Sequence, residues 1–338
     1  MPGEVIRYVD PNSTGGNGTT NELSGPNAAY SSLYDWDDAE ATDITSLDVV
    51  HRVICSSNQD AGGGSANTTA VTLDSWTTDD TRYIQIESAS SHGGKWNDNI
   101  FRISYTSASN GAAVDIRLST RHIKFVGIQI EVNPTSTNYV HPVRCYSTIN
   151  GDYVFTFDKC IMRMTGTNSR WGYGVQGNTP SSGIGTINSI NCQFYGFDYS
   201  TYGCAFDVHT SVIVNMYNTT IVDCTNSWYN SGGGNTVNAW NVGQSNVDNP
   251  VTGTTCSSTT PTFVDPVSYD YHLQSSDTTW KDQGTTDPGT GLYSDDIDGQ
   301  TRSGTWDIGA DEYISTASQR LSDARIILEA RSDGTVST

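Results

Sequence analysis

The sequence has little positive charge and no long apolar run. Its 338 residues contain 17 Lys and Arg against 37 Asp and Glu, which gives a net charge of -20. Such a charge would repel a phosphate backbone, so nucleic-acid binding is not expected. No run of about 18 apolar residues occurs, so no membrane-spanning helix is expected either.

Residue types that favour helices are also scarce, whereas Thr, Val, Ile and Tyr are plentiful. This composition disfavours a helical bundle and favours strands. Disorder is not expected, because 8 Phe, 8 Trp and 18 Tyr can supply a core.

The seven cysteines form no CxxC pair, which excludes zinc sites and thioredoxin-type sites of the usual spacing. We expect reduced, buried thiols that pack as small apolar groups. The alternative, one or two disulfides, would require an oxidising compartment.

The N-terminal sequence MPGEVIRYVD lacks the charged and apolar regions of a secretory signal. The acidic, hydroxyl-rich body is nevertheless typical of exported or particle-surface proteins. These two features together favour a protein made in a host cytoplasm and displayed on a virion. The alternative is a secreted or cell-surface protein whose signal is missing from this sequence.

An internal repeat is the most informative pattern. Segments 122–132, 153–164, 186–197 and 212–223 align at intervals of roughly 30 residues. One predicted core column contains Ile128, Cys160, Cys192 and Thr219, and a second column lies two residues further on. Just before the first column, Lys159, Asn191 and Asn218 stand where a bend needs a turn residue.

Each unit is therefore predicted to comprise a strand, a bend, a second short strand and a long polar loop. Units this short must stack on one another to bury their apolar faces. Asn side chains at the bends are expected to form ladders, and loops 133–151, 165–185, 198–210 and 225–235 are expected to protrude. The pattern predicts an all-β, single-stranded, right-handed parallel β-helix with an N-terminal cap and a C-terminal extension; a sandwich or propeller is the alternative.

Both ends of the chain carry a resemblance to known proteins. RYVDPNSTGGNGTTNELSGPNAAYSSLYDW (7–36), PTFVDPVSYDYHLQSSDTTWKDQGT (261–285) and DIDGQTRSGTWDIGADEY (296–313) resemble the opening, late and closing motifs of parallel β-helix repeat proteins of the pectate-lyase-like superfamily. One departure is DTTWKD at 277–282, where these proteins usually have a small-apolar-Asp run. The resemblance implies the fold but no single function, because the superfamily includes lyases, hydrolases, adhesins and phage spikes.

The resulting division is a cap and first coil at 1–58, a β-helix body at 59–260, closing coils at 261–313 and an extension at 314–338. Ile308 and Tyr313 are expected to plug the open end of the last coil. In the extension, Ile326, Ile327 and Leu328 belong to a half-apolar segment that would suit docking by strand addition. The alternative is a strand that folds back onto its own coil.

Candidate catalytic residues are few. Uronic-acid lyases need a cation beside the substrate carboxylate and a base, and Arg121, His122 and Lys124 form the densest basic cluster. Asp207 and His209 are further candidates, since hydrolases use carboxylates across a cleft. Solvated or Asp-paired outward positions explain these residues better than catalysis does.

Candidate binding residues are equally few. Aromatic side chains in the loops could stack on sugar faces: Trp171, Tyr173, Trp228, Tyr229 and Trp240. In loops between coils, such side chains more often pin the loop to the body or form subunit contacts. Asp296 and Asp298 resemble the start of a calcium loop but lack its bidentate Glu, so a turn is favoured and no cofactor is expected.

The first functional hypothesis is a structural protein of a tailed-phage virion, located on the capsid, a fibre or the tail. Its expected partners are other virion proteins or its own copies, with a trimer as one form, and host-surface polysaccharide. The alternative is a polysaccharide lyase or glycoside hydrolase acting on an acidic glycan, although the net charge opposes an anionic substrate. A third reading is a cell-surface adhesin.

Overall fold

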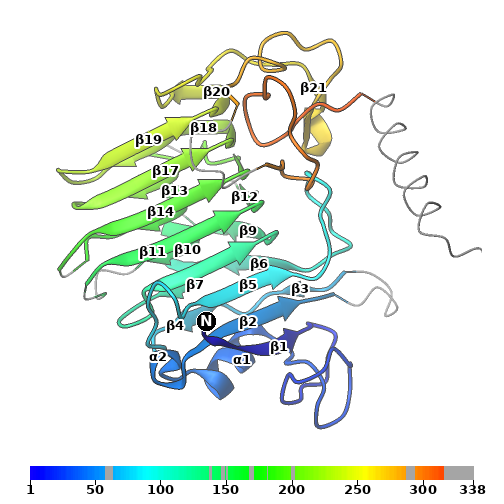
Figure 1. Cartoon of the computed structure of the whole chain (residues 1–338), viewed down its shortest axis with the longest axis vertical. Coiled ribbons are helices and arrows are strands. Elements are labelled where there is room, and N and C mark those ends of the chain that lie inside the picture. The colour runs from blue at the N-terminus through cyan, green and yellow to red at the C-terminus, as the bar shows by residue number, and fades with distance from the viewer. Residues whose placement is uncertain are drawn as a thin grey trace, which may run out of the picture.

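The computed structural model describes residues 1–57, 64–136, 139–145, 149, 151–166, 171–180, 182–198, 202–286 and 294–315. Over these residues the chain is mostly strand, and the strands lie one above another in a tall stack (Figure 1). All pairings within the stack are parallel, which is consistent with an all-β parallel β-helix. No helix of the described residues is long and apolar enough to cross a lipid bilayer.

The first sheet of the described chain contains eight strands in order along the stack. They are β1 (Gly3–Val9), β2 (Val49–Cys55), β5 (Ile84–Ser88), β8 (His122–Val126), β11 (Tyr153–Asp158), β14 (Gly185–Ile190), β17 (Val212–Tyr217) and β19 (Thr236–Trp240). Inward and outward positions alternate along them, as the strand periodicity predicts.

The second sheet follows the first after a short bend. It contains β3 (Ala66–Asn67), β6 (Arg102–Ser107), β9 (Gln129–Pro134), β12 (Ile161–Met164), β15 (Gln193–Tyr195), β18 (Thr220–Asn230) and β20 (Gly243–Asn249). The predicted column lies here at equivalent positions of successive coils, because Ile161 N–H donates to Ile128 C=O at 3.0 Å and Gln193 N–H donates to Cys160 C=O at 2.9 Å. Thr220 N–H continues the series by donating to Cys192 C=O at 2.8 Å.

Three strands of a third sheet, which β18 joins to the second as one 12-stranded sheet, lie in segments that the sequence predicted as protruding loops, so that prediction was wrong. The third sheet contains β4 (Val71–Leu73), β7 (Gly111–Ile116), β10 (Tyr139–Cys145), β13 (Trp171–Gly177) and β16 (Cys204–Val208). The second half of β18 joins it, because β18 pairs first with β15 and then with β16. Stacked inward residues such as Val143, Val175 and Phe206 supply the apolar contacts that hold these polar segments in place.

The bend between the first and second sheets needs a left-handed residue in each coil. The bend residues of successive coils have φ values of 53° at Lys159, 51° at Asn191, 46° at Asn218 and 52° at Asn241. Asn tolerates this conformation well. The predicted side-chain ladder is present: Asn218 Nδ2 donates to Asn191 Oδ1 at 3.2 Å, and Asn241 Nδ2 donates to Asn218 Oδ1 at 3.0 Å.

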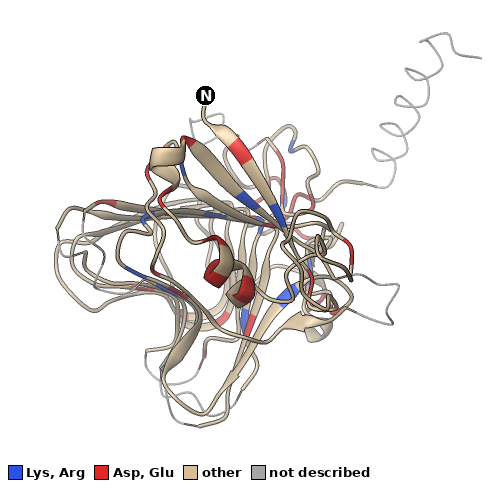
Figure 2. Ribbon diagram, turned by 90° about the horizontal axis from the view of Figure 1, so that it is seen from below, with Lys and Arg blue, Asp and Glu red and all other residues tan. Residues whose placement is uncertain are grey.

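Two short helices lie at the N-terminal end, α1 (Leu33–Glu40) and α2 (Ile44–Leu47). Seen along the stack, α1 lies across this end of the molecule (Figure 2). Ser32 begins α1 by accepting a hydrogen bond from the backbone of Asp35, and α1 buries Leu33 and Trp36. The Trp36 ring stacks on Trp76 with a centroid distance of 5.1 Å.

The C-terminal segment packs against the flank of the stack. It forms an antiparallel pair, β21 (Phe263–Asp265) and β22 (Asp270–Leu273), joined by the short helix η2 (Pro266–Ser268). Ile308 lies in an apolar cluster with Ile161, Tyr195 and Val222, and Tyr313 packs against the same cluster. Both residues therefore cover the outer face of the second sheet and do not plug the open end as predicted.

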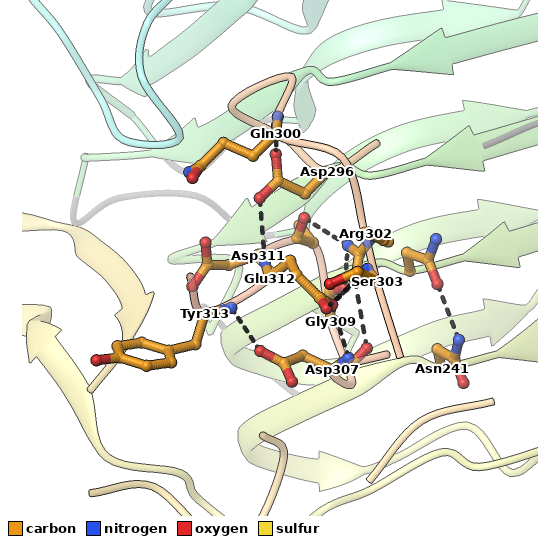
Figure 3. Close-up of polar contacts among 12 residues, drawn as sticks. Asn241, Asp296, Gln300, Arg302, Ser303, Asp307, Gly309, Asp311, Glu312 and Tyr313 are labelled. Carbon is orange, nitrogen blue, oxygen red and sulfur yellow. Dashed lines mark hydrogen bonds and ion pairs between the residues drawn. The ribbon is translucent and has the colours of Figure 1, made fainter. Parts of the chain in front are cut away.

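One buried cation organises this segment. The Arg302 side chain is fully buried and donates to the carbonyls of Ala310 at 2.7 Å and Gly309 at 2.9 Å (Figure 3). Its partner carboxylate, Glu312, lies 3.3 Å away. Burial raises the pKa of Glu312 to about 7.

The cysteines are free thiols, as expected. Six are buried, and Cys256 is partly exposed.

Candidate functional site

The predicted catalytic residues lie on two different sheets. Arg121, His122 and Lys124 are in or beside β8 of the first sheet, whereas Asp207 and His209 are in or just after β16 of the third. The structure therefore forms no single site from these five residues.

Asp207 is part of a compact polar network. Its side chain is 1% exposed and accepts hydrogen bonds from Gln176 Nε2 at 2.8 Å and from Ser231 Oγ. His209 Nε2 lies 3.4 Å from the same carboxylate. Both carboxylate oxygens thus have partners, which fits a stabilising role in the third sheet.

A second buried carboxylate lies on the same outward row. Asp115 is 4% exposed and receives Arg144 Nε at 3.0 Å and Nη2 at 2.8 Å. Arg117 Nε donates to it as well, at 3.1 Å. Two guanidinium groups thus neutralise the one Asp115 carboxylate.

The outer face of the first sheet carries a groove of about 450 Å³. It is lined by Gln85, Lys124, Val126, Thr156, Asp158, Asn188, Ile190 and Tyr217. A smaller hollow of about 110 Å³ adjoins it and shares Lys124 and Thr156. Lys124 contributes a positive charge to both hollows, and its Nζ lies 4.1 Å from the centre of the Tyr83 ring.

Straight rows of outward residues pass through this groove, where Thr156 and Asn188 line it, and continue beyond it along the sheet. Parallel pairing aligns Thr156, Asn188, Asn215 and Asn238 on successive strands. The three amides form a ladder, with Asn238 Nδ2 donating to Asn215 Oδ1 and Asn215 Nδ2 donating to Asn188 Oδ1, both at 2.9 Å. Asn188 Nδ2 in turn donates to Thr156 Oγ1 at 3.3 Å.

The adjacent row ends in an aromatic pair. Tyr217 and Trp240 occupy equivalent positions on β17 and β19, and their rings stack at 4.8 Å with 11° between the planes. Both side chains are half-buried. One face of each ring is thus covered by the other ring, and the partly exposed remainder of the pair can contact an apolar ligand surface.

Within the described part of the chain, none of the five predicted aromatic residues is among the residues that line the groove, and only Trp240 contacts one of them, Tyr217. Tyr173 is 1% exposed and stacks on His141 at 5.2 Å, so it offers no free face to a sugar. Trp228 packs against the main core, and Tyr229 contacts Tyr202 edge-to-face at 5.1 Å. The side chain of Trp171 lies outside the described residues.

Two titrating groups border the groove. Burial raises the pKa of Asp158 to about 6, and the charge of Lys159 opposes this increase. Burial and the neighbouring Arg121 lower the pKa of His122, so this imidazole is neutral at pH 7. The predicted basic cluster therefore presents less charge than its sequence indicates.

The two residues of the predicted calcium pair, Asp296 and Asp298, contact different partners. Asp296 is buried and accepts backbone hydrogen bonds from Gln300 at 2.7 Å, Asp298 at 3.0 Å and Glu312 at 3.2 Å. Asp296 therefore holds a turn, as the favoured reading had it.

Asp298 instead accepts from His272 Nε2 at 3.0 Å. One ligand atom each of His272, Asp298 and Asp311 lies within 4.8 Å of the others. Burial alone would lower the pKa of His272, but Asp298, Asp311 and Asp270 raise it to about 10. A protonated His272 is thus the cation that these carboxylates surround.

Sequence reasoning missed Tyr217 and the Asn188–Asn215–Asn238 ladder. The repeat alignment ended at residue 223; extended to 236–242, it would have matched Tyr217 with Trp240 and Asn215 with Asn238. The predicted docking residues Ile326, Ile327 and Leu328 lie outside the described residues.

No protein-family profile matches the sequence, and no curated protein matches it significantly.

Proposed function

We propose that this protein is a right-handed parallel β-helix of the pectate-lyase-like type, a structural component of a tailed-phage particle that binds host-surface glycans. The groove on the first sheet carries the glycan-binding part of this proposal. Its lining contains Tyr217, Asn188 and only two charged groups, Lys124 and Asp158, and the stacked Trp240 ring and the rest of the amide ladder continue beside it. This composition resembles that of ligand sites with an apolar surface and a few oriented polar groups.

The virion part of the proposal rests on the acidic, hydroxyl-rich composition and on the extension after the closing motif. The acidic surface opposes nucleic-acid and acidic-polymer partners. The extension after residue 313, with Ile326, Ile327 and Leu328, is proposed to dock the stack onto other virion proteins or onto its own copies. Removing residues 316–338 should abolish particle incorporation; unchanged incorporation and oligomeric state would refute this docking role.

Glycan binding is tested with the fluorescently labelled full chain on an array of bacterial surface polysaccharides. We expect retention on a subset of glycans, loss of retention for Trp240→Ala, and normal retention for the control Tyr34→Ala. Tyr34 is a matched control because it is an aromatic side chain, 51% exposed, on α1 at the N-terminal end of the stack. Failure to bind any glycan, or equal binding by all three proteins, would refute the assignment.

One observation favours a second function, hydrolysis of the bound glycan. Asp158 lines the groove and has a raised pKa of about 6, which suits a general acid. Incubation with each retained glycan should then generate new reducing ends, and Asp158→Asn should abolish them. Unsaturated products that depend on Arg121, His122 or Lys124 would instead indicate a lyase.

A further inference from the structure

We propose that His272, Asp298 and Asp311 bind one divalent cation, with Zn²⁺ preferred, and that this ion fastens the C-terminal segment against the stack. One ligand atom of each residue lies within 4.8 Å of the other two. An imidazole nitrogen together with two carboxylates is a donor set typical of Zn²⁺ and related transition metals. The proposal is independent of glycan binding, because the cluster lies away from the groove on the first sheet.

The backbone of the C-terminal segment places the three ligands together. His272 is on β22, and the neighbouring Leu273 N–H donates to Asp311 Oδ2 at 2.7 Å, which holds that carboxylate beside the strand. Asp298 is in the turn that Asp296 holds, and its own N–H donates to Asp296 Oδ1 at 3.0 Å. An ion therefore meets ligands that are already positioned, which lowers the cost of binding.

The second ring nitrogen of His272 has the partner that a metal ligand needs. Its Nδ1–H donates to the Asp270 carboxylate, which also contacts Lys95 Nζ at 3.1 Å. Metal-binding histidines usually donate their other N–H to a carboxylate, which orients the ring and makes the ligating nitrogen more basic. Nε2 faces Asp298 Oδ2 at 3.0 Å, and the cation takes the place of the proton at this nitrogen.

One carboxylate oxygen of the cluster is buried without a partner. Asp298 Oδ2 accepts from His272 and from Gln300 Nε2, whereas Asp298 Oδ1 has no hydrogen-bond partner among the described residues. Leaving a charged oxygen buried and unpaired is costly, and a bound cation removes that cost.

Gly94 allows the chain to pass close to these ligand atoms. A Cβ at this position would lie 2.2 Å from Asp298 Oδ1 and 2.4 Å from His272 Nε2. Any side chain at position 94 would therefore displace both atoms at once.

A second histidine lies beside the cluster. His92 is 3% exposed, and its Nε2–H donates to the Lys159 carbonyl at 2.8 Å, so the lone pair is on Nδ1. This Nδ1 has no hydrogen-bond partner among the described residues. His92 and Asp298 line one hollow of about 230 Å³, which gives an ion a path to the cluster. Lys159 lines it too, but its ammonium is paired with Asp295.

The experiment is calorimetric titration of the full chain, first treated with EDTA and dialysed, with zinc chloride, manganese chloride or calcium chloride. We expect one Zn²⁺ per chain with a Kd below about 10 μM. Ca²⁺ should bind at least tenfold more weakly, because it prefers a shell made only of oxygen ligands. Zn²⁺ at about a hundredfold excess over its Kd should raise the midpoint of thermal unfolding by about 3–5 °C.

Ligand variants and a control locate the ion. His272→Gln and Asp311→Asn should each weaken Zn²⁺ binding at least tenfold and remove the zinc-dependent shift in thermal unfolding. His209→Gln is the matched control, because His209 Nε2 also lies beside a carboxylate, 3.4 Å from Asp207, but on the third sheet. This variant should bind Zn²⁺ as the wild type does.

A pair of glycine variants tests the same position without removing a ligand. Gly93 and Gly94 have similar left-handed φ values of 60° and 63°, yet a Cβ at Gly93 would meet nothing within 4 Å. Both alanine variants therefore carry similar backbone strain. Gly94→Ala should lose Zn²⁺ binding and Gly93→Ala should retain it; circular dichroism establishes that each variant is folded.

The proposal is overturned if the wild type does not bind Zn²⁺, or if His272→Gln and Asp311→Asn both bind it with unchanged affinity. Ca²⁺ binding as tight as that of Zn²⁺ also overturns it, because an imidazole ligand would then contribute nothing. If a variant does not fold, wild-type crystals soaked in zinc chloride decide the question. Anomalous density at the zinc edge beside His272 Nε2 and the two carboxylates supports the site, and a zinc peak only elsewhere overturns it.

Discussion

Replacement of Asn218 tests whether stacked side chains at the bend stabilise the coils. Asn218 is fully buried, has φ 46°, and makes one amide hydrogen bond to the coil below and one to the coil above. Asn218→Ala removes both bonds, at about 1 kcal/mol each. The left-handed backbone conformation also costs alanine about 1 kcal/mol, so the expected loss of unfolding free energy is about 3 kcal/mol.

Asn218→Gly separates the two contributions. Glycine adopts the left-handed conformation freely, so only the hydrogen bonds are lost, and the expected cost is about 2 kcal/mol. The neighbours keep other partners: Asn241 Nδ2 also donates to the Thr285 carbonyl at 3.0 Å, and Asn191 Oδ1 also faces Arg302 at 3.5 Å. No larger desolvation cost is therefore expected.

The assay is equilibrium unfolding in guanidinium, followed by tryptophan fluorescence after reversibility has been established. Asn188→Ala is the matched control, because this amide belongs to a ladder on the half-exposed groove face, where water can replace its partners. It should cost under about 1 kcal/mol. The reasoning fails if the unfolding free energy of Asn218→Ala lies within about 0.5 kcal/mol of that of the wild type, or if Asn188→Ala lowers the unfolding free energy by as much as Asn218→Ala does.

Two further predictions concern the C-terminal segment. Arg302→Met should lower the unfolding free energy by about 3–5 kcal/mol, because Glu312 is left buried without its cation. The double variant with Glu312→Gln should recover part of this loss, and guanidinium unfolding measures both. An unchanged unfolding free energy in Arg302→Met would contradict the buried pair. His272 has a pKa raised to about 10 from an ordinary 6.5, so its stabilising contribution is complete below pH 6.5 and is lost as the pH rises through 10. In His272→Gln the fall in unfolding free energy between pH 7 and 10 should therefore be smaller than in the wild type, and identical profiles would exclude this ion pair.

The repeat in the sequence predicted the column at Ile128, Cys160, Cys192 and Thr219, because apolar side chains that stack must recur at equivalent positions. It also predicted the bend residues, since a left-handed position favours Asn. The third sheet escaped prediction because segments such as WGYGVQG are Gly-rich and polar, and only the contacts of neighbouring coils make them strands.

Two parts of the candidate site were not predicted from the sequence. Asp296 and Asp298 are two residues apart, yet one binds backbone N–H groups and the other binds His272, a partner far along the chain. The groove depends on the alternation of strands as well as on in-register stacking, so Tyr217 becomes an aromatic partner of Trp240 only once both strands are aligned. A contact between residues far apart in the sequence decides the first case, whereas an alignment extended to 236–242 would have matched Tyr217 with Trp240.

The most direct test of the account is a crystal structure of the full chain with a glycan that it retains on the array. The account predicts sugar density in the groove on the first sheet, beside Lys124, Asn188 and Tyr217. Sugar density along the third sheet, over Asp115 and Asp207, with an empty groove on the first sheet would contradict it.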